Sequence, residues 1–222
     1  MTSHDVVAIT RRALNFKKIG HCGTLDPMAT GLLMLVIGRA TKIQDLLMSE
    51  DKRYEGTLTL GATTSSQDRM GEVIEEKEVP NLSAEELKKA FDQLTGNFEQ
   101  IPPMVSAIKK DGVPLYKLAR KGQEVERPPR PVHVTNYEIS RIDLPEVEFQ
   151  VDCSKGFYVR TYAHDIGQSL GCGAHLSALR RTRSGKFTLD RAVTVDEIKT
   201  SSAEALKGRM ISLAEISVMR GV

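Results

Sequence analysis

The chain has 222 residues, of which 40% are apolar and 27% charged, and its formal net charge is +2. These values are typical of a globular protein and exclude an acidic disordered chain, a polybasic tail and a repeat array. The longest apolar run, Leu32 to Ile37, is too short to span a bilayer, and the first residues lack the pattern of a secretory signal. Three cysteines without a CxxC pair favour a cytoplasmic protein in which each is a small buried apolar residue, namely Cys22, Cys153 and Cys172.

Apolar spacing in the first sixty residues predicts both helices and strands. The expected elements are a helix over residues 5–18 with Ser3 as its cap, a buried strand over 32–37, a helix over 40–48, and a strand that contains Tyr54, Leu58 and Leu60. Segments with an apolar residue at every third or fourth position, as in helices, therefore alternate with segments in which every second residue is apolar, as in strands.

A capping box predicts the next helix, because Ser83 is followed by Glu86 three residues later. Leu87, Phe91 and Leu94 form its apolar stripe, and Gly96 is placed to end it. The later elements are strands around 132–134 and 147–153, short helices over 161–170 and 173–181, and an amphipathic segment over 195–206. Strands with one buried and one solvent-exposed face favour antiparallel pairing. The expected fold class is therefore α+β, with a mixed, largely antiparallel sheet flanked by helices.

Charge is distributed unevenly along the chain. Residues 72–92 hold seven acidic residues and three lysines, whereas residues 155–186 hold six basic residues and only Asp165 as an acid. Residues 11–18 add four basic residues and no acid. Such runs usually form a solvated face, and nucleic-acid binding is the alternative.

The segment GHCGTLDPMATG, residues 20–31, has the composition of a functional loop. Asp26 precedes Pro27, and this pair is also a common way to start a turn of helix. Alternatively, Asp26 is a carboxylate on a glycine-framed loop, available as a nucleophile or a base. The residues alone leave both interpretations open.

A buried, charged carboxylate needs a cation close to it. Arg160 is a candidate, since it lies two residues after Tyr158 in a segment that we interpret as a continuing strand, with both side chains on one face. An ordinary surface arginine is the alternative. Tyr54 follows Lys52 and Arg53, an arrangement suited to stacking a nucleobase, although core packing would explain Tyr54 equally well.

No metal or cofactor motif is present in the sequence. The five histidines show no zinc-ligand spacing, and neither a dinucleotide fingerprint nor a P-loop occurs. The GxSxG turn of serine hydrolases is also missing. We therefore expect neither a metal nor an organic cofactor.

The loop at residues 20–31 resembles GHxGTLDPxATG, the catalytic box of the TruB family of tRNA pseudouridine synthases. Four further blocks agree with the family in order, namely DKRYEGTLTLG, GATTSSQDRMG, PPMVSAIKKDGVPLYKLARKG and CSKGFYVRTYAHDIGQSLGCGAHLSALRRTRSG. The resemblance runs from Thr2 to about Glu215. It implies a pseudouridine synthase fold and the isomerisation of uridine 55 in the T-loop of tRNA, without metal or cofactor.

The resemblance also implies individual roles. Asp26 is similar to the catalytic aspartate, Tyr54 to the tyrosine that stacks on the target base, and Arg160 to the arginine paired with the aspartate. Tyr158 and Leu179 resemble pocket residues, and His21 resembles the histidine that helps to extrude the base. The basic side chains that we expect to contact phosphates are Lys155, Arg180, Arg181 and Arg183.

The chain departs from the family at its two ends. Met1-Thr2-Ser3 looks like the end of a KPxGxTS motif, so the strand that precedes it is expected to be missing. We expect one catalytic domain over residues 1–215 and a tail over 216–222 without a PUA domain. Cys22 replaces the more usual threonine of the box.

The expected enzyme is a monomer that binds the T-arm stem-loop of tRNA and no membrane. Two other functions are open, a tRNA-folding chaperone and a non-catalytic RNA-binding remnant. Intact Asp26, Tyr54 and Arg160 favour the enzyme. Attack of Asp26 on the uracil ring, attack on the sugar and removal of a sugar proton all remain open.

Overall fold

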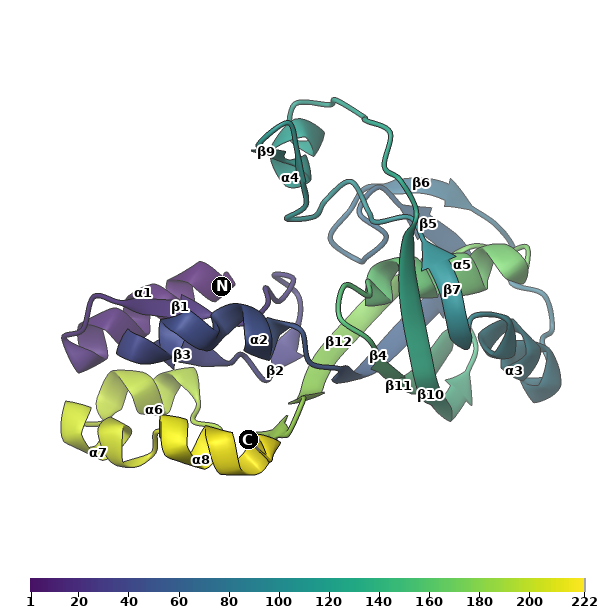
Figure 1. Ribbon diagram of the computed structural model, residues 1–222. Coiled ribbons are helices and arrows are strands. Elements are labelled where there is room, and N and C mark those ends of the chain that lie inside the picture. Colours follow the sequence, from purple (N-terminus) through teal and green to yellow (C-terminus); the bar gives the residue numbers. More distant parts are fainter. Residues whose placement is uncertain (222) are drawn as a thin grey trace. The chain divides into compact units, whose positions relative to one another are not determined.

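The computed structural model describes residues 1–221 and divides the chain into two compact units (Figure 1). Unit 1 combines the two ends of the chain, Met1–Arg53 and Arg180–Val222, and unit 2 is the continuous segment Tyr54–Leu179. The chain leaves unit 1 within strand β4 (Lys52–Leu60) and returns to it within β12 (Ala174–Ser184). Within residues 1–221, no helix combines the length and the apolar character needed to cross a bilayer.

Unit 1 is mainly helical with short strands. From the N-terminal part it contains α1 (Ser3–Leu14), β1 (Ile19–His21), β2 (Thr30–Gly31), β3 (Leu35–Ile37), the 3₁₀ helix η1 (Gly38–Ile43) and α2 (Gln44–Met48). From the C-terminal part it contains β13 (Phe187–Thr188), the 3₁₀ helix η2 (Leu189–Arg191), α6 (Val195–Thr200), α7 (Ala203–Gly208) and α8 (Leu213–Arg220). β1 and β3 are antiparallel, whereas β2 pairs in parallel with the end of β12.

Helix α1 ties the two ends of the chain together in unit 1. It begins with a capping box at Thr2 and Asp5, so the cap is Thr2 rather than the predicted Ser3. Val7 and Leu14 of α1 are buried in one cluster with residues of the C-terminal helices, Ile198 and Leu206. A second buried cluster holds Cys22, Leu32, Met34, Val36, Leu47 and Ile216. Burial of these apolar residues is what keeps the C-terminal helices on the N-terminal segment.

Unit 2 is a sheet with helices packed on it. Its strands and helices are β5 (Ala62–Thr64), β6 (Val73–Glu76), α3 (Ala84–Gln93), β7 (Gly96–Gln100), β8 (Lys109–Lys110), β9 (Val113–Pro114), α4 (Leu115–Ala119), β10 (Arg130–Asp143), β11 (Glu146–Cys153) and α5 (Val159–Ser169). The sheet order in this unit is β12-β4-β11-β10-β7, and β10 is antiparallel to both of its neighbours. The predicted α+β class with a largely antiparallel sheet is confirmed.

Aromatic residues form the core of unit 2 between the sheet and its helices. Phe91 of α3, Phe149 of β11 and Tyr162 of α5 pack edge to face, with ring centroids 5.6–5.9 Å apart. Each such pair adds about 0.5–1.5 kcal/mol beyond the burial of its area. The predicted capping box at Ser83 is confirmed, and Leu87 and Phe91 of the predicted stripe are fully buried, whereas Leu94 is half-buried and caps the C-terminus of the helix.

Two predictions of local structure around the site are wrong. Residues 173–181 were predicted to be helical, but from Ala174 they belong to strand β12, which pairs with β2 and β13 at its C-terminal end. Tyr158 and Arg160 do not share one face of a strand, because Tyr158 caps helix α5 and Arg160 lies in its first turn. In the first case, pairing of β12 with segments distant in the sequence decides the structure.

Other boundaries also differ from the predictions, and the helix expected over 5–18 ends at Leu14. The helix expected over 40–48 is divided into η1 and α2, and the segment 195–206 is divided into α6 and α7, where Ser202 caps the second helix. Residues expected to form a tail from 216 continue helix α8 as far as Arg220, with Ile216 buried, while Val222 lies outside the described residues.

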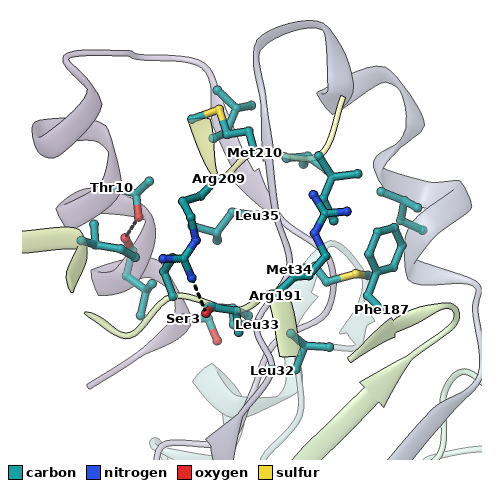
Figure 2. A pocket seen from close by; sticks show the side chains of 18 of the residues that line it. Ser3, Thr10, Leu32, Leu33, Met34, Leu35, Phe187, Arg191, Arg209 and Met210 are labelled. Atoms are coloured by element: carbon teal, nitrogen blue, oxygen red, sulfur yellow. Dashed lines mark hydrogen bonds between the residues drawn. The ribbon is translucent and has the colours of Figure 1, made fainter. Parts of the chain in front are cut away.

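Strand β3 has one open edge in unit 1. Cys22 N–H donates to the Met34 carbonyl at 2.9 Å and Gly38 N–H to the Lys18 carbonyl at 2.8 Å, which places the backbone groups of Leu35 and Ile37 on the edge away from β1. Among residues 1–221, β3 pairs only with β1. A cavity of about 690 Å³ lies against β3 (Figure 2) and is lined mainly by apolar residues, including Val6, Leu14, Leu35, Ile198 and Met210.

We predict that adding an upstream apolar strand that ends in KPxG raises the thermal midpoint of the protein. Such a strand would pair with the open edge of β3 and fill the adjacent cavity, and a gain of ~1–2 kcal/mol corresponds to a rise of several degrees. Circular dichroism at 222 nm measures the midpoint. A Gly-Ser extension of the same length is the control, and equal midpoints for the two extended proteins would contradict the prediction.

Candidate active site

Asp26 lies in a tight turn of the segment 20–31, which we call the Asp26 loop. The Asp26 carbonyl accepts a hydrogen bond from the Ala29 N–H at 2.9 Å, with Pro27 at the second position of the turn. The pair Asp26-Pro27 therefore starts a turn and not a helix. The Asp26 residue is half-buried.

Neighbouring elements of unit 1 anchor the loop. The Leu25 N–H donates to Ser3 Oγ at 3.0 Å, and Ser3 is itself 5% exposed at the start of α1. The Cys22 N–H donates to the Met34 carbonyl just before β3. Backbone groups on the N-terminal side of Asp26 are thus held by both α1 and the β3 segment.

His21 ends β1 at the start of the loop. Its ring packs against His4 in a T-shaped contact, with centroids 5.1 Å apart. Burial lowers the pKa of His21, and the charges of His4 and Arg181 lower it further. His21 is therefore neutral at neutral pH and can donate or accept a hydrogen bond without carrying charge.

The three cysteines form no disulfide within residues 1–221, and all three are buried, as predicted. Burial raises the pKa of Cys22 to about 11, so the thiol in the Asp26 loop is protonated at neutral pH. Cys22 belongs to the apolar cluster of unit 1, where it acts as a small apolar side chain.

Arg160 is buried in unit 2, with 2% of its surface exposed. Its Nη1 donates to the Ser66 carbonyl at 2.9 Å and its Nη2 to the Val105 carbonyl at 2.8 Å. Its Nε lies 3.6 Å from Oδ2 of Asp68, which is 4% exposed. These contacts exclude the alternative of an ordinary surface arginine.

Asp68 is the residue of this site that sequence reasoning missed. Its Oδ1 accepts hydrogen bonds from Ser66 Oγ at 2.6 Å and from the Met70 N–H at 2.9 Å. Gln67, with φ at +62°, accepts a hydrogen bond from the Thr161 hydroxyl at 2.8 Å, which ties this turn to α5. Asp68 lies in the block GATTSSQDRMG, but no local pattern connects it with an arginine so far along the chain.

The other predicted pocket residues of unit 2 lie on fixed elements. Gln100 is 2% exposed and forms two hydrogen bonds with the backbone of Tyr158. Its Oε1 accepts from the Tyr158 N–H at 2.8 Å, and its Nε2 donates to the Tyr158 carbonyl at 3.0 Å. Tyr54 and Leu179 lie on the neighbouring strands β4 and β12. Tyr54 is half-buried and Leu179 is buried. Asp26 belongs to unit 1 and Arg160 to unit 2, so their pairing stays a prediction.

The basic residues expected to contact phosphates have different environments. Lys155 and Arg180 are exposed and Arg183 is half-buried. Arg181, however, is 2% exposed and donates to the carbonyls of Leu32 and Gly23 within unit 1. An interior side chain does not reach an RNA phosphate, so the expectation of a phosphate contact is corrected for Arg181.

Family models cover almost all of the chain. Residues 11–159 match the N-terminal domain of the TruB family pseudouridylate synthases, and residues 160–215 match the C-terminal domain of tRNA pseudouridylate synthase B. The tRNA pseudouridine synthase B of Opitutus terrae is 56% identical over 210 residues, which are 95% of this chain and 87% of that protein. The protein of the same name from Geobacter sulfurreducens is 50% identical over 199 residues, 90% of this chain and 66% of its own.

Solved structures of related proteins have the same fold. A crystal structure of a Cbf5-Nop10-Gar1 complex matches with a TM-score of 0.69 at 31% identity, over 89% of this chain and 50% of that chain. An H/ACA RNP bound to a substrate RNA containing 2'-deoxyuridine matches with a TM-score of 0.68 at 26% identity, over 97% and 54%. The chain spans about half the length of these solved chains. The predicted pseudouridine synthase fold is confirmed.

We predict that Asp68→Asn destabilises the protein by about 1–3 kcal/mol, because it keeps the shape of the side chain but removes the negative charge that Asp68 places beside the buried Arg160. Urea denaturation measures the free energy of unfolding. Asp143→Asn is the matched control, since Asp143 pairs with Arg141 at an exposed position of unit 2 and its loss should cost about 0.5 kcal/mol or less. Equal effects of the two substitutions would contradict a stabilising role of the buried pair.

Proposed function

The chain belongs to the TruB family of pseudouridylate synthases, and from this premise we propose that it converts uridine 55 in the T-loop of tRNA to pseudouridine. The observation that carries the proposal is the Asp26 loop, a GHCGTLDPMATG segment held by α1, β3 and β12 with its carboxylate half-buried. Relatives named tRNA pseudouridine synthase B, at 46–56% identity, support tRNA as the substrate.

The reaction explains why a held carboxylate is required. The bond from ribose to the uracil nitrogen breaks and a bond to carbon five forms, so the base must leave the loop, detach and turn before it is reattached. Asp26 can attack the uracil ring, attack the sugar or remove a sugar proton. In each route its carboxylate must be charged and fixed against the nucleotide.

The residues of unit 2 supply the remaining roles in the proposal. Tyr54 stacks on the extruded uracil, and Tyr158 and Leu179 form further walls of its pocket. Arg160 keeps the carboxylate of Asp26 charged, with a guanidinium that Asp68 and two carbonyls already orient. In unit 1, His21 assists the extrusion of the base as a neutral ring.

Exposed and half-buried basic residues bind the RNA backbone in this proposal. Lys155, Arg180 and Arg183 contact phosphates around the T-loop, and the basic residues of 11–18 extend this contact along the T-arm. The protein acts as a monomer, and residues 1–215 are its catalytic domain. Both family models lie within this range, which supports the assignment.

We predict that Asp26→Asn abolishes the isomerisation and changes tRNA affinity by no more than a few-fold, because it keeps the size of the side chain and removes the reacting group. Tritium release from carbon five of uracil in tRNA measures the reaction, since that hydrogen is lost when carbon five becomes the glycosidic atom. Asp196→Asn, a control at a side chain 88% exposed on α6, should react like the parent.

Two results would contradict this prediction in different ways. Tritium release near the parent rate from Asp26→Asn would reject Asp26 as the catalytic residue. A parent protein that binds tRNA without tritium release would favour the tRNA chaperone or the RNA-binding remnant.

We also predict that charge reversal at both Arg180 and Arg183 flattens the slope of log affinity for tRNA against log salt. Each lost phosphate contact lowers the magnitude of this slope by about 0.7–0.9, so the loss of two contacts should lower it by about 1.4–1.8. Filter binding over a series of salt concentrations measures the slope. Arg141→Glu is the control, because Arg141 is exposed in unit 2 and has no role in the proposal. An unchanged slope for the double variant would place the RNA on another surface.

A further inference from the structure

Arg181 is the largest of the deeply buried side chains in the described part of the chain. Burial of a guanidinium is costly unless its donors are satisfied, so its hydrogen bonds should reveal what it does. Its Nε donates to the Leu32 carbonyl at 2.8 Å, and its Nη2 donates to the Gly23 carbonyl at 3.3 Å. The acceptors therefore lie on the two sides of Asp26 along the chain.

The backbone of Arg181 binds the same loop. The Leu32 N–H donates to the Arg181 carbonyl at 2.7 Å, and Gly31 is the parallel partner of Arg181 in the pairing of β2 with β12. One residue of β12 thus fixes the C-terminal end of the Asp26 loop through its main chain and both flanks through its side chain.

Two glycines of the loop accommodate this arrangement. Gly31 has φ at +92°, and a Cβ atom there would lie 2.2 Å from the Arg181 carbonyl oxygen. Gly23 has φ at +91°, and a Cβ atom there would lie 3.5 Å from Arg181 Nη1. The approach at Gly31 allows no side chain, so the loop and Arg181 fit each other closely.

The partners of the Arg181 side chain also argue against an ordinary structural ion pair. Within residues 1–221, the hydrogen bonds of its guanidinium go to the carbonyls of Gly23 in the loop and of Leu32 directly after it, and no carboxylate forms a salt bridge with it. A lysine would offer a single nitrogen, whereas the arginine directs two separate nitrogens, Nε and Nη2, at the two carbonyls from one planar group. The choice of arginine is explained by the need to span the loop.

We propose that Arg181 is a positioning residue that holds the Asp26 loop in its reactive shape, an inference that rests on the proposed role of Asp26 in catalysis. Arg181 touches neither substrate nor reacting atoms in this role. A displacement of a catalytic group by about 1 Å can cost about 100-fold in rate, so a loosened loop should impair turnover far more than tRNA binding.

The loop carries its own reporter for the test. Cys22 lies next to Gly23 in unit 1 and is 1% exposed, while Cys153 and Cys172 are buried in unit 2 at 1% and 3%. The experiment measures modification of each cysteine by a thiol reagent, mapped by mass spectrometry, in the parent and in Arg181→Met, Arg181→Lys and Arg180→Met. The same proteins are assayed for single-turnover tritium release and for tRNA affinity.

We expect modification of Cys22 to be about tenfold faster or more in Arg181→Met, with Cys153 and Cys172 unchanged, because only the loop opens more often. Tritium release at saturating tRNA should fall by about 100-fold while the Kd for tRNA stays within about threefold. In Arg181→Lys, both the increase in Cys22 modification and the loss of tritium release should be smaller than in Arg181→Met. Arg180→Met, at the exposed neighbour, should weaken tRNA binding and leave Cys22 protected.

Three results would overturn the inference. Cys22 modified at the parent rate in folded Arg181→Met would show that the loop does not depend on Arg181. A parallel increase at all three cysteines would indicate a general loss of stability. Weaker tRNA binding by Arg181→Met, with an unchanged rate of tritium release, would indicate that Arg181 contacts an RNA phosphate. A parent protein without tritium release would reject the proposed function alone, because faster modification of Cys22 supports the loop-holding role independently of catalysis.

Discussion

Each unit of this protein holds a buried arginine whose hydrogen bonds are accepted largely by backbone carbonyls. Arg181 in unit 1 and Arg160 in unit 2 are both 2% exposed, and each donates to carbonyls of segments far from it in the sequence. A buried guanidinium is tolerated only when such acceptors are fixed in place, so the surrounding fold must bring the loops to it. The rest of each unit can be understood as the frame that does so.

The frames differ in how they are stabilised. In unit 1 the two ends of the chain meet through apolar clusters, and Cys22 of the Asp26 loop is itself part of one of them. In unit 2 the edge-to-face aromatic cluster of Phe91, Phe149 and Tyr162 fixes α5 on the sheet, and Arg160 lies in the first turn of that helix. Apolar packing therefore positions the charged residues, and the charged residues in turn position the loops.

Sequence reasoning found the elements whose signals are local. The capping box of α3, the antiparallel pair β10 and β11, and the loop around Asp26 needed only neighbouring residues to be recognised. It failed at residues 173–181, where pairing of β12 with distant strands decides the structure. Asp68 was missed for the same reason, because its contact with Arg160 is formed by the tertiary structure alone.

The strand character of β12 changes what its basic residues can do. Successive side chains of a strand point to opposite faces, so Arg180 is exposed while Arg181 is buried, and the two cannot form one phosphate-binding patch. Of the six basic residues over 155–186, Arg160 and Arg181 lie in the interior. The charge available to RNA is therefore smaller than the sequence count suggests, and the salt dependence of tRNA binding should reflect the exposed residues only. In the proposed function, specificity then comes from the fit of the extruded base against Tyr54, Tyr158 and Leu179, which lie on fixed elements of unit 2.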